Sequence, residues 1–121
     1  AKNYANERTA FGKPIGKFEG IQFKFADMSA EIRAMELMTY DTARMKAEGK
    51  RHTLEAAQTK LFSGVHCTQI CLECQQVLGG NGYSKEYHVE RFVRDAKLLE
   101  IGEGTNEILR MLIGGTVLAQ K

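Results

Sequence analysis

Apolar residues recur at helical spacing along most of this 121-residue chain. Between residues 18 and 48 they alternate steps of four and three, which is typical of a helix that packs in a bundle. The members of this seam are Ile21, Phe25, Met28, Ile32, Met35, Thr39 and Thr42. No stretch alternates convincingly between apolar and polar residues with a period of two, as a half-buried strand would. The pattern therefore predicts an all-α fold.

Glycines and one proline divide the pattern into separate helices. They predict a break at 9–17, a stop at Gly49 and a second stop at Gly79. Thr53 is expected to cap the second long helix. Short connections between long amphipathic helices indicate an antiparallel four-helix-bundle-type domain with a short extra helix. The predicted helices cover residues 1–8, 18–48, 53–78, 87–99 and 106–118.

Composition narrows the class of protein without indicating a function. The length fits one domain, and 43% hydrophobic with 26% charged residues is ordinary for a globular protein. A formal net charge of +2 favours neither nucleic acid nor an anionic membrane as a partner. No apolar run reaches the roughly 18 residues of a membrane-spanning helix. Because the chain lacks an initiator Met and begins in a helical pattern, we expect a fragment of a longer protein.

Three cysteines, Cys67, Cys71 and Cys74, fall within one predicted helix. Their odd number fits a reducing compartment better than a disulfide framework. Their spacing also occurs at iron–sulfur sites, where the thiolates lie on a loop. A helical position instead favours thiols that pack as small hydrophobic residues, and His66 would point about 100° away from them. We therefore expect no metal site.

The segment 101–105 places a single carboxylate between two glycines. Thr105 is expected to cap the following helix, so Glu103 would lie beside a helix N-terminus that favours its ionised form. A carboxylate held in this way can act as a general base. Taken alone, the local pattern favours a solvated glutamate in a capped turn.

Two other segments could contact an anionic ligand. Gly79-Gly80-Asn81-Gly82 has the composition of a phosphate-binding loop, but it lacks the G-x-G-x-x-G frame and is more typical of a helix end. Arg8 offers a fork of donors to a phosphate. An arginine at a helix end also complements the helix dipole, so each segment has a structural explanation as well.

The order of these segments resembles the C-terminal helical domain of the acyl-CoA dehydrogenase family. The resemblance covers essentially the whole chain and implies a single domain over residues 1–121. Family members are longer and carry an N-terminal helical domain and a middle β-domain, both absent from this sequence. The matching motifs are R-T-A-F-G-K-P-I from Arg8, Q-V-L-G-G-N-G-Y from Gln76, R-D-A-K from Arg94 and I-G-E-G-T-N-E-I from Ile101.

The resemblance implies an FAD-dependent oxidation of an acyl-CoA thioester to the trans-2-enoyl-CoA. Glu103 matches the glutamate that removes the α-proton, and its backbone N–H matches a donor to the thioester oxygen. Glu103 and Gly104 are thus the expected substrate contacts. The positions expected to contact FAD are Arg8, Phe11, Gln76, Gly79, Gly80, Thr105 and Glu107.

The resemblance also implies partners. Family members usually form tetramers through this domain, so we expect a homotetramer or homodimer in which Arg8 and Gln76 serve the FAD of a neighbouring subunit. Electron-transfer flavoprotein is the expected electron acceptor. The expected compartment is the bacterial cytoplasm or the mitochondrial matrix. Alternatives are an acyl-CoA oxidase or a glutaryl-CoA dehydrogenase of the same fold, or a helical oligomerisation module without chemistry.

Three positions depart from relatives within the family. Ala10 replaces a threonine and Glu19 replaces a glutamine, and both changes affect expected cofactor contacts. Gly102 stands where some members carry tyrosine, so we expect more space beside the base.

Overall fold

The computed structural model of the chain describes residues 1–119, and six α-helices account for most of them. The all-α class predicted from the sequence is confirmed. The helices are α1 (Lys2–Glu7), α2 (Glu19–Ala47), α3 (Thr53–Leu78), α4 (Gly80–Tyr83), α5 (Val89–Ile101) and α6 (Asn106–Ala119). None of the helices within this part of the chain is long and apolar enough to cross a membrane.

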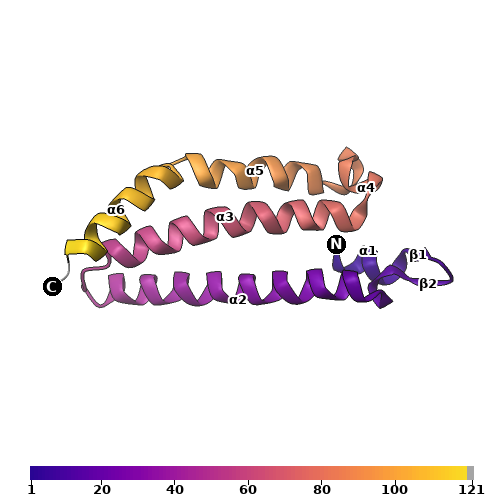
Figure 1. Cartoon of the computed structure of the whole chain (residues 1–121), viewed down its shortest axis with the longest axis horizontal. Coiled ribbons are helices and arrows are strands. Elements are labelled where there is room, and N and C mark those ends of the chain that lie inside the picture. Colours follow the sequence, from indigo (N-terminus) through magenta and orange to yellow (C-terminus); the bar gives the residue numbers. More distant parts are fainter. Residues whose placement is uncertain (120–121) are drawn as a thin grey trace.

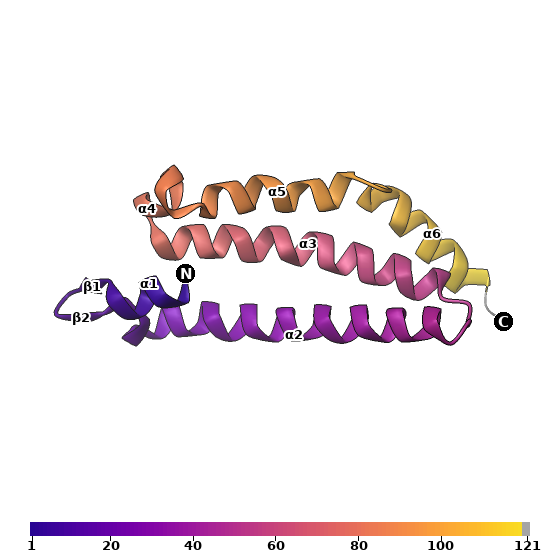
Figure 2. The ribbon, with the colours of Figure 1, turned by 180° about the vertical axis from the view of Figure 1, so that it is seen from behind.

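Helix α3 lies in the middle of the domain, with α2 along one side and α5 followed by α6 along the other (Figure 1). The view from behind shows the same order of layers (Figure 2). Helices α2 and α3 run antiparallel, and so do α3 and α5. Because α3 contacts both outer layers, its sequence has to supply two packing faces.

One face of α3 packs against α2 through a mixture of apolar and polar contacts. Met28 is buried, and its Sδ lies 3.7 Å from Sγ of Cys74. Lys24 and Glu73 form an ion pair between the two helices. Only part of the predicted α2 seam is covered: Ile32 stays 44% exposed. The reason is that α3 is the main helix in contact with α2, so most of the seam is covered from one side.

The other face of α3 approaches α5 closely at Gly64. A Cβ at this position would lie 3.0 Å from the carbonyl oxygen of Leu99, which is tighter than ordinary van der Waals contact. A residue without a side chain is what allows the two helices to approach so closely at this point. The end of α5 is thereby held directly on α3.

The N-terminal segment closes one end of the domain. Ala5, Val77, Leu78 and Val89 form a buried apolar cluster that joins α1 to the end of α3 and the start of α5. The Asn81 side-chain amide also donates to the Tyr4 hydroxyl at 2.9 Å. These contacts fix the position of the segment that follows α1.

The predicted break at 9–17 is confirmed, but several local details differ from the predictions. The segment 9–17 contains a short antiparallel hairpin of β1 (Thr9–Ala10) and β2 (Lys13–Pro14), which is too short to produce an alternating pattern. Thr53 is the first residue of α3 rather than its cap, because the N-cap position falls on His52 and no side chain bonds there. Helix α5 begins at Val89 instead of residue 87, since Lys85–Tyr87 forms a separate 3-10 turn.

Candidate functional site

Glu103 lies in the short turn between α5 and α6, in an unusual backbone conformation. Helix α5 ends at Ile101, and the N–H of Gly102, its C-cap residue, donates to the carbonyl oxygen of Leu98 at 2.7 Å. Glu103 and Gly104 then adopt φ values of 54° and 106°. For a residue with a side chain, the left-handed region costs about 1–2 kcal/mol, and strain of this kind gathers at functional sites. The side chain of Glu103 is exposed.

Thr105 caps α6 as predicted. Its Oγ1 accepts from the N–H of Ile108 at 3.4 Å, and its carbonyl oxygen accepts from the N–H of Leu109 at 3.0 Å. Glu103 therefore sits two residues before the N-cap of a 14-residue helix, where the partial positive charge favours a carboxylate. Glu107 lies one residue into the same helix, with its side chain 80% exposed and 3.7 Å from Arg110.

Two side-chain contacts that the sequence analysis missed connect this turn to the rest of the domain. Asn106 Nδ2 donates to Glu100 Oε2 at 3.3 Å, which links α6 to α5 across the turn. The ammonium group of Lys60 on α3 donates to the carbonyl oxygen of Leu99. The burial of an asparagine at the first position of α6 gives no signal in a hydrophobic pattern, so only the fold could identify it.

Arg8 follows α1 and Phe11 lies in the turn between β1 and β2, and Figure 1 shows α1 and this hairpin at the end of the domain where α5 begins, opposite the turn that carries Glu103. Arg8 lines an open cavity of about 480 Å³ together with Asn81 and Tyr87, and it forms no ion pair with any residue of 1–119. The side chain of Phe11, at a φ of 50° in the hairpin turn, is 97% exposed. A free guanidinium and an uncovered aromatic ring at one end of the domain are what an anionic, ring-containing ligand requires.

The glycine-rich segment lies at this same end. Helix α3 stops at Gly79, which has a φ of 59°, so the predicted helix stop is confirmed. Apart from its immediate neighbours along the chain, nothing lies within 4 Å of a Cβ placed on Gly79 or Gly80. Gly82 differs, because a Cβ there would lie 2.4 Å from the carbonyl oxygen of Gln75. Gln76, Gly79 and Gly80 are exposed, so a ligand can reach this backbone.

The two groups of predicted residues are not brought together within one chain. Glu103, Gly104, Thr105 and Glu107 lie at the C-terminal end of α5, and the remaining residues lie at its N-terminal end. The 13 residues of α5 separate them by about 20 Å at a rise of 1.5 Å per residue. A single copy therefore presents two partial sites.

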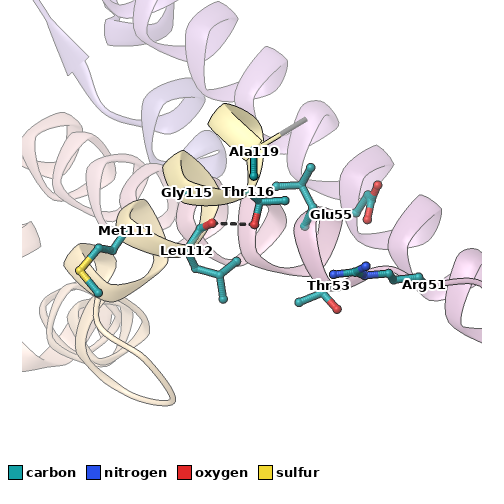
Figure 3. A pocket seen from close by; sticks show the side chains of 9 residues that line it. Arg51, Thr53, Glu55, Met111, Leu112, Gly115, Thr116 and Ala119 are labelled. Atoms are coloured by element: carbon teal, nitrogen blue, oxygen red, sulfur yellow. Dashed lines mark hydrogen bonds between the residues drawn. The ribbon is translucent and has the colours of Figure 1, made fainter. Parts of the chain in front are cut away.

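The cavity drawn in Figure 3 contains none of the predicted residues. It measures about 790 Å³ and lies between the start of α3 and the last turns of α6. Arg51 and Glu55 line one side and Met111 the other, while Thr116 bonds to the carbonyl oxygen of Leu112 in its own helix at 2.8 Å. Its size alone assigns it no chemistry.

The cysteines lie on α3 and are partly buried. Burial, with Cys67 as a further cause, raises the pKa of Cys71 to about 11. Burial also raises the pKa of Cys74. Within residues 1–119, no three His, Cys, Asp or Glu side chains are grouped to hold a metal ion. The thiols of Cys71 and Cys74 therefore stay protonated near neutral pH and act as packing groups.

The all-α fold agrees with comparisons to known proteins. The family model described as "Acyl-CoA dehydrogenase, C-terminal domain" matches residues 1–118. The chain belongs to this family.

Individual relatives are similar over nearly the whole chain. The chain is 50% identical over 115 residues to the probable acyl-CoA dehydrogenase YngJ of Bacillus subtilis, covering 95% of the chain and 30% of that protein. The structure of butyryl-CoA dehydrogenase from Megasphaera elsdenii matches with a TM-score of 0.95 at 44% identity, covering 97% of the chain and 30% of that structure. An FAD complex of PigA matches with a TM-score of 0.92 at 27% identity, covering 96% and 30%. The chain thus spans about 30% of the length of these relatives.

Proposed function

We propose that this chain is the C-terminal domain of an FAD-dependent acyl-CoA dehydrogenase in which Glu103 is the base for the α-proton. The observation that carries the proposal is the conformation of Glu103. A glutamate in the left-handed region, directly before a capped helix, occupies the turn that family resemblance assigns to the base. Such a conformation needs support from its surroundings, and here that support is present on both sides.

In the proposed reaction the carboxylate of Glu103 accepts the α-proton of the acyl-CoA thioester. The N-terminus of α6 favours the ionised form that a base requires. The side chain of Glu103 is exposed in the single chain, so bound substrate would cover it and exclude water from around it. A backbone N–H beside the thioester oxygen would stabilise the enolate charge that develops.

FAD is the cofactor we propose, and it would accept the β-hydride. The fit rests on the unpaired Arg8 guanidinium, the exposed ring of Phe11 and the open backbone at Gly79 and Gly80. Because about 20 Å of helix separates these residues from Glu103, we propose that they serve the site of a second subunit. Gln76 would join them there, and Thr105 and Glu107 would contact the cofactor on the Glu103 side. A homotetramer or homodimer follows from this arrangement.

The departures from the family pattern affect the edges of the site. A Cβ on Gly102 would lie 3.2 Å from the carbonyl oxygen of Leu98, so a side chain here requires a small shift of the turn. We propose that the glycine leaves space beside the thioester. Ala10 lies in β1, and Glu19 is an exposed residue at the start of α2, so neither change disturbs the fold.

The proposed substrate is an acyl-CoA thioester, and the proposed electron acceptor is electron-transfer flavoprotein. One relative supports this acceptor by its description as the CarC subunit of a caffeyl-CoA reductase–Etf complex. Relatives include bacterial and mitochondrial proteins, so we retain the bacterial cytoplasm or the mitochondrial matrix as the compartment.

The test is anaerobic titration of the full-length flavoprotein with acyl-CoA thioesters of different chain length. Loss of the oxidised-flavin absorbance with formation of enoyl-CoA is the expected result. A protein that purifies without flavin would instead support an oligomerisation module. Rapid oxygen consumption would indicate an acyl-CoA oxidase, and carbon dioxide release from glutaryl-CoA would indicate a glutaryl-CoA dehydrogenase.

A further inference from the structure

The turn that carries Glu103 is bridged by a side-chain hydrogen bond. Asn106 Nδ2, at the first position of α6, donates to Glu100 Oε2 in the last turn of α5 at 3.3 Å. Lys60 holds the neighbouring carbonyl of Leu99 from α3. Both ends of the four-residue connection 102–105 are therefore fixed, while Glu103 between them is exposed.

Asn106 is a costly residue to bury. Its exposed fraction is 4%, and within residues 1–119 it is the only polar or charged residue that is buried. Its Oδ1 is also buried and has no hydrogen-bond partner within this part of the chain. Exchanging the two amide atoms would not help, because it would place Oδ1 against the Glu100 carboxylate, which is also an acceptor. An unpaired buried acceptor reduces stability. We therefore infer that Asn106 serves to hold α6 against α5 through its bond to Glu100.

Glu100 is itself held in place as the acceptor. Lys97 Nζ donates to the same Oε2 at 3.0 Å. The side chains of Thr68 and Lys97 hold the pKa of Glu100 below its ordinary value, so it accepts bonds throughout the neutral range. The proton of the Thr68 hydroxyl goes to the carbonyl oxygen of Gly64 at 3.1 Å, which fixes this side chain on the α3 backbone.

Gly64 forms the surface on which the bridge rests. A Cβ there would approach the carbonyl oxygen of Leu99 to 3.0 Å and Oδ1 of Asn106 to 3.6 Å. The α3 backbone therefore limits how far either end of the turn can move. A left-handed residue is kept only where the surrounding structure imposes it, and this bridge is the polar contact that spans Glu103.

We propose that Glu100 and Asn106 are positioning residues that hold the turn in the conformation from which Glu103 removes the α-proton. The proposal rests on the proposed function of Glu103 as base. Neither residue touches the substrate: the bond between them acts through the backbone of 102–105. Loss of the bond should slow proton removal without releasing the cofactor.

The first test is Asn106→Leu in the full-length flavoprotein. Leucine has a similar size and removes the unpaired Oδ1, so the melting temperature should stay close to that of the wild type. The first-order rate of anaerobic flavin reduction by substrate should fall about 10–100-fold, because displacement of a reacting group by about 1 Å can cost that much. FAD content should be unchanged. The matched control is Thr42→Val, which removes the 2.9 Å bond between Thr42 on α2 and Thr59 on α3, and should leave the reduction rate unchanged.

A second pair of variants separates the bond from the charge. Glu100→Gln keeps an oxygen that can accept from Asn106, whereas Glu100→Ala does not. The glutamine variant should therefore reduce flavin at close to the wild-type rate, and the alanine variant should be as slow as Asn106→Leu. Equal losses in the two Glu100 variants would contradict the proposal, because they would point to the charge of Glu100.

The proposal is overturned if Asn106→Leu reduces flavin at the wild-type rate, or if its loss of rate is matched by a loss of FAD or of melting temperature. Glu103→Gln distinguishes this failure from that of the proposed function. If Glu103→Gln still reduces flavin, the assignment of the base is wrong. If Glu103→Gln is inactive while Asn106→Leu is normal, only the positioning role is wrong.

Discussion

Replacing Gly82 with alanine tests how tightly the glycine-rich segment packs against the end of α3. Gly82 lies in the single-turn helix α4, and its backbone carbonyl accepts from Gln75 Nε2 at 3.2 Å. An added Cβ would lie 2.4 Å from the carbonyl oxygen of Gln75 and 3.0 Å from its Cα. These neighbours are backbone atoms, so they cannot rotate away as a flexible side chain would.

The size of the effect follows from two opposing terms. Ordinary contact begins at 3.4 Å, so α4 and α3 must separate by about 1 Å, the difference between 3.4 and 2.4 Å. Overpacking of this kind costs about 1–3 kcal/mol. Alanine favours the helical conformation over glycine by up to about 1 kcal/mol, which offsets part of this cost. Because the contact at 2.4 Å is with backbone atoms, the cost lies in the upper part of this range, about 2–3 kcal/mol, so the expected net loss is about 1–2 kcal/mol and Tm should fall.

Thermal unfolding of the full-length protein measures this change, with FAD content recorded in the same samples. Gly20→Ala is the matched control, because no atom lies within 4 Å of a Cβ at Gly20 in α2. That substitution should raise stability by up to about 1 kcal/mol. The two substitutions should therefore shift Tm in opposite directions. A Tm for Gly82→Ala equal to or above that of the wild type would refute the argument from close packing.

Three further predictions concern single side chains. Burial raises the pKa of Cys71 from its ordinary value of 9.0 to about 11, which reduces its thiolate fraction at neutral pH about 100-fold, so iodoacetamide should label it far more slowly in the native than in the unfolded protein. Folding lowers the pKa of Glu100 below its ordinary value of 4.5, so the ionised carboxylate contributes its full stabilisation above pH 4.5. This stabilisation is lost as the pH falls further and the carboxylate is protonated. Glu100→Gln should therefore flatten the decline of Tm between about pH 5 and 3. Thr105→Ala should cost about 0.5–2 kcal/mol through loss of the α6 cap, and Thr105→Ser should restore most of it in thermal unfolding.

The long helices were predictable because their signals are local. Apolar spacing indicated the extent of α2 and α3 to within a residue at each end, and the φ of 59° at Gly79 is what a glycine stop requires. The β1–β2 hairpin escaped detection because two-residue strands carry too few positions for a pattern. The incomplete burial of the α2 seam depends on which helices lie beside α2, and spacing along one helix contains no such information.

In the candidate site, too, local features could be predicted from the sequence and tertiary contacts could not. The cap at Thr105 was predicted from residue type and position, and the structure confirms it. The left-handed φ of Glu103 was not expected, because glutamate rarely adopts it. The bridge between Glu100 and Asn106 depends on how α5 and α6 meet on Gly64, which is a tertiary contact. The separation of Glu103 from Arg8 became measurable only when α5 was placed between them.

The most direct test of the account is anaerobic flavin reduction by substrate in a full-length Glu103→Gln variant. Glutamine keeps the size of the side chain but cannot take the α-proton, so the oxidised-flavin absorbance should persist after substrate is added, with FAD still bound. Glu36→Gln makes the same change on an exposed part of α2, where the side chain is 53% exposed, and should reduce flavin normally. Near-normal flavin reduction by Glu103→Gln would contradict the central claim.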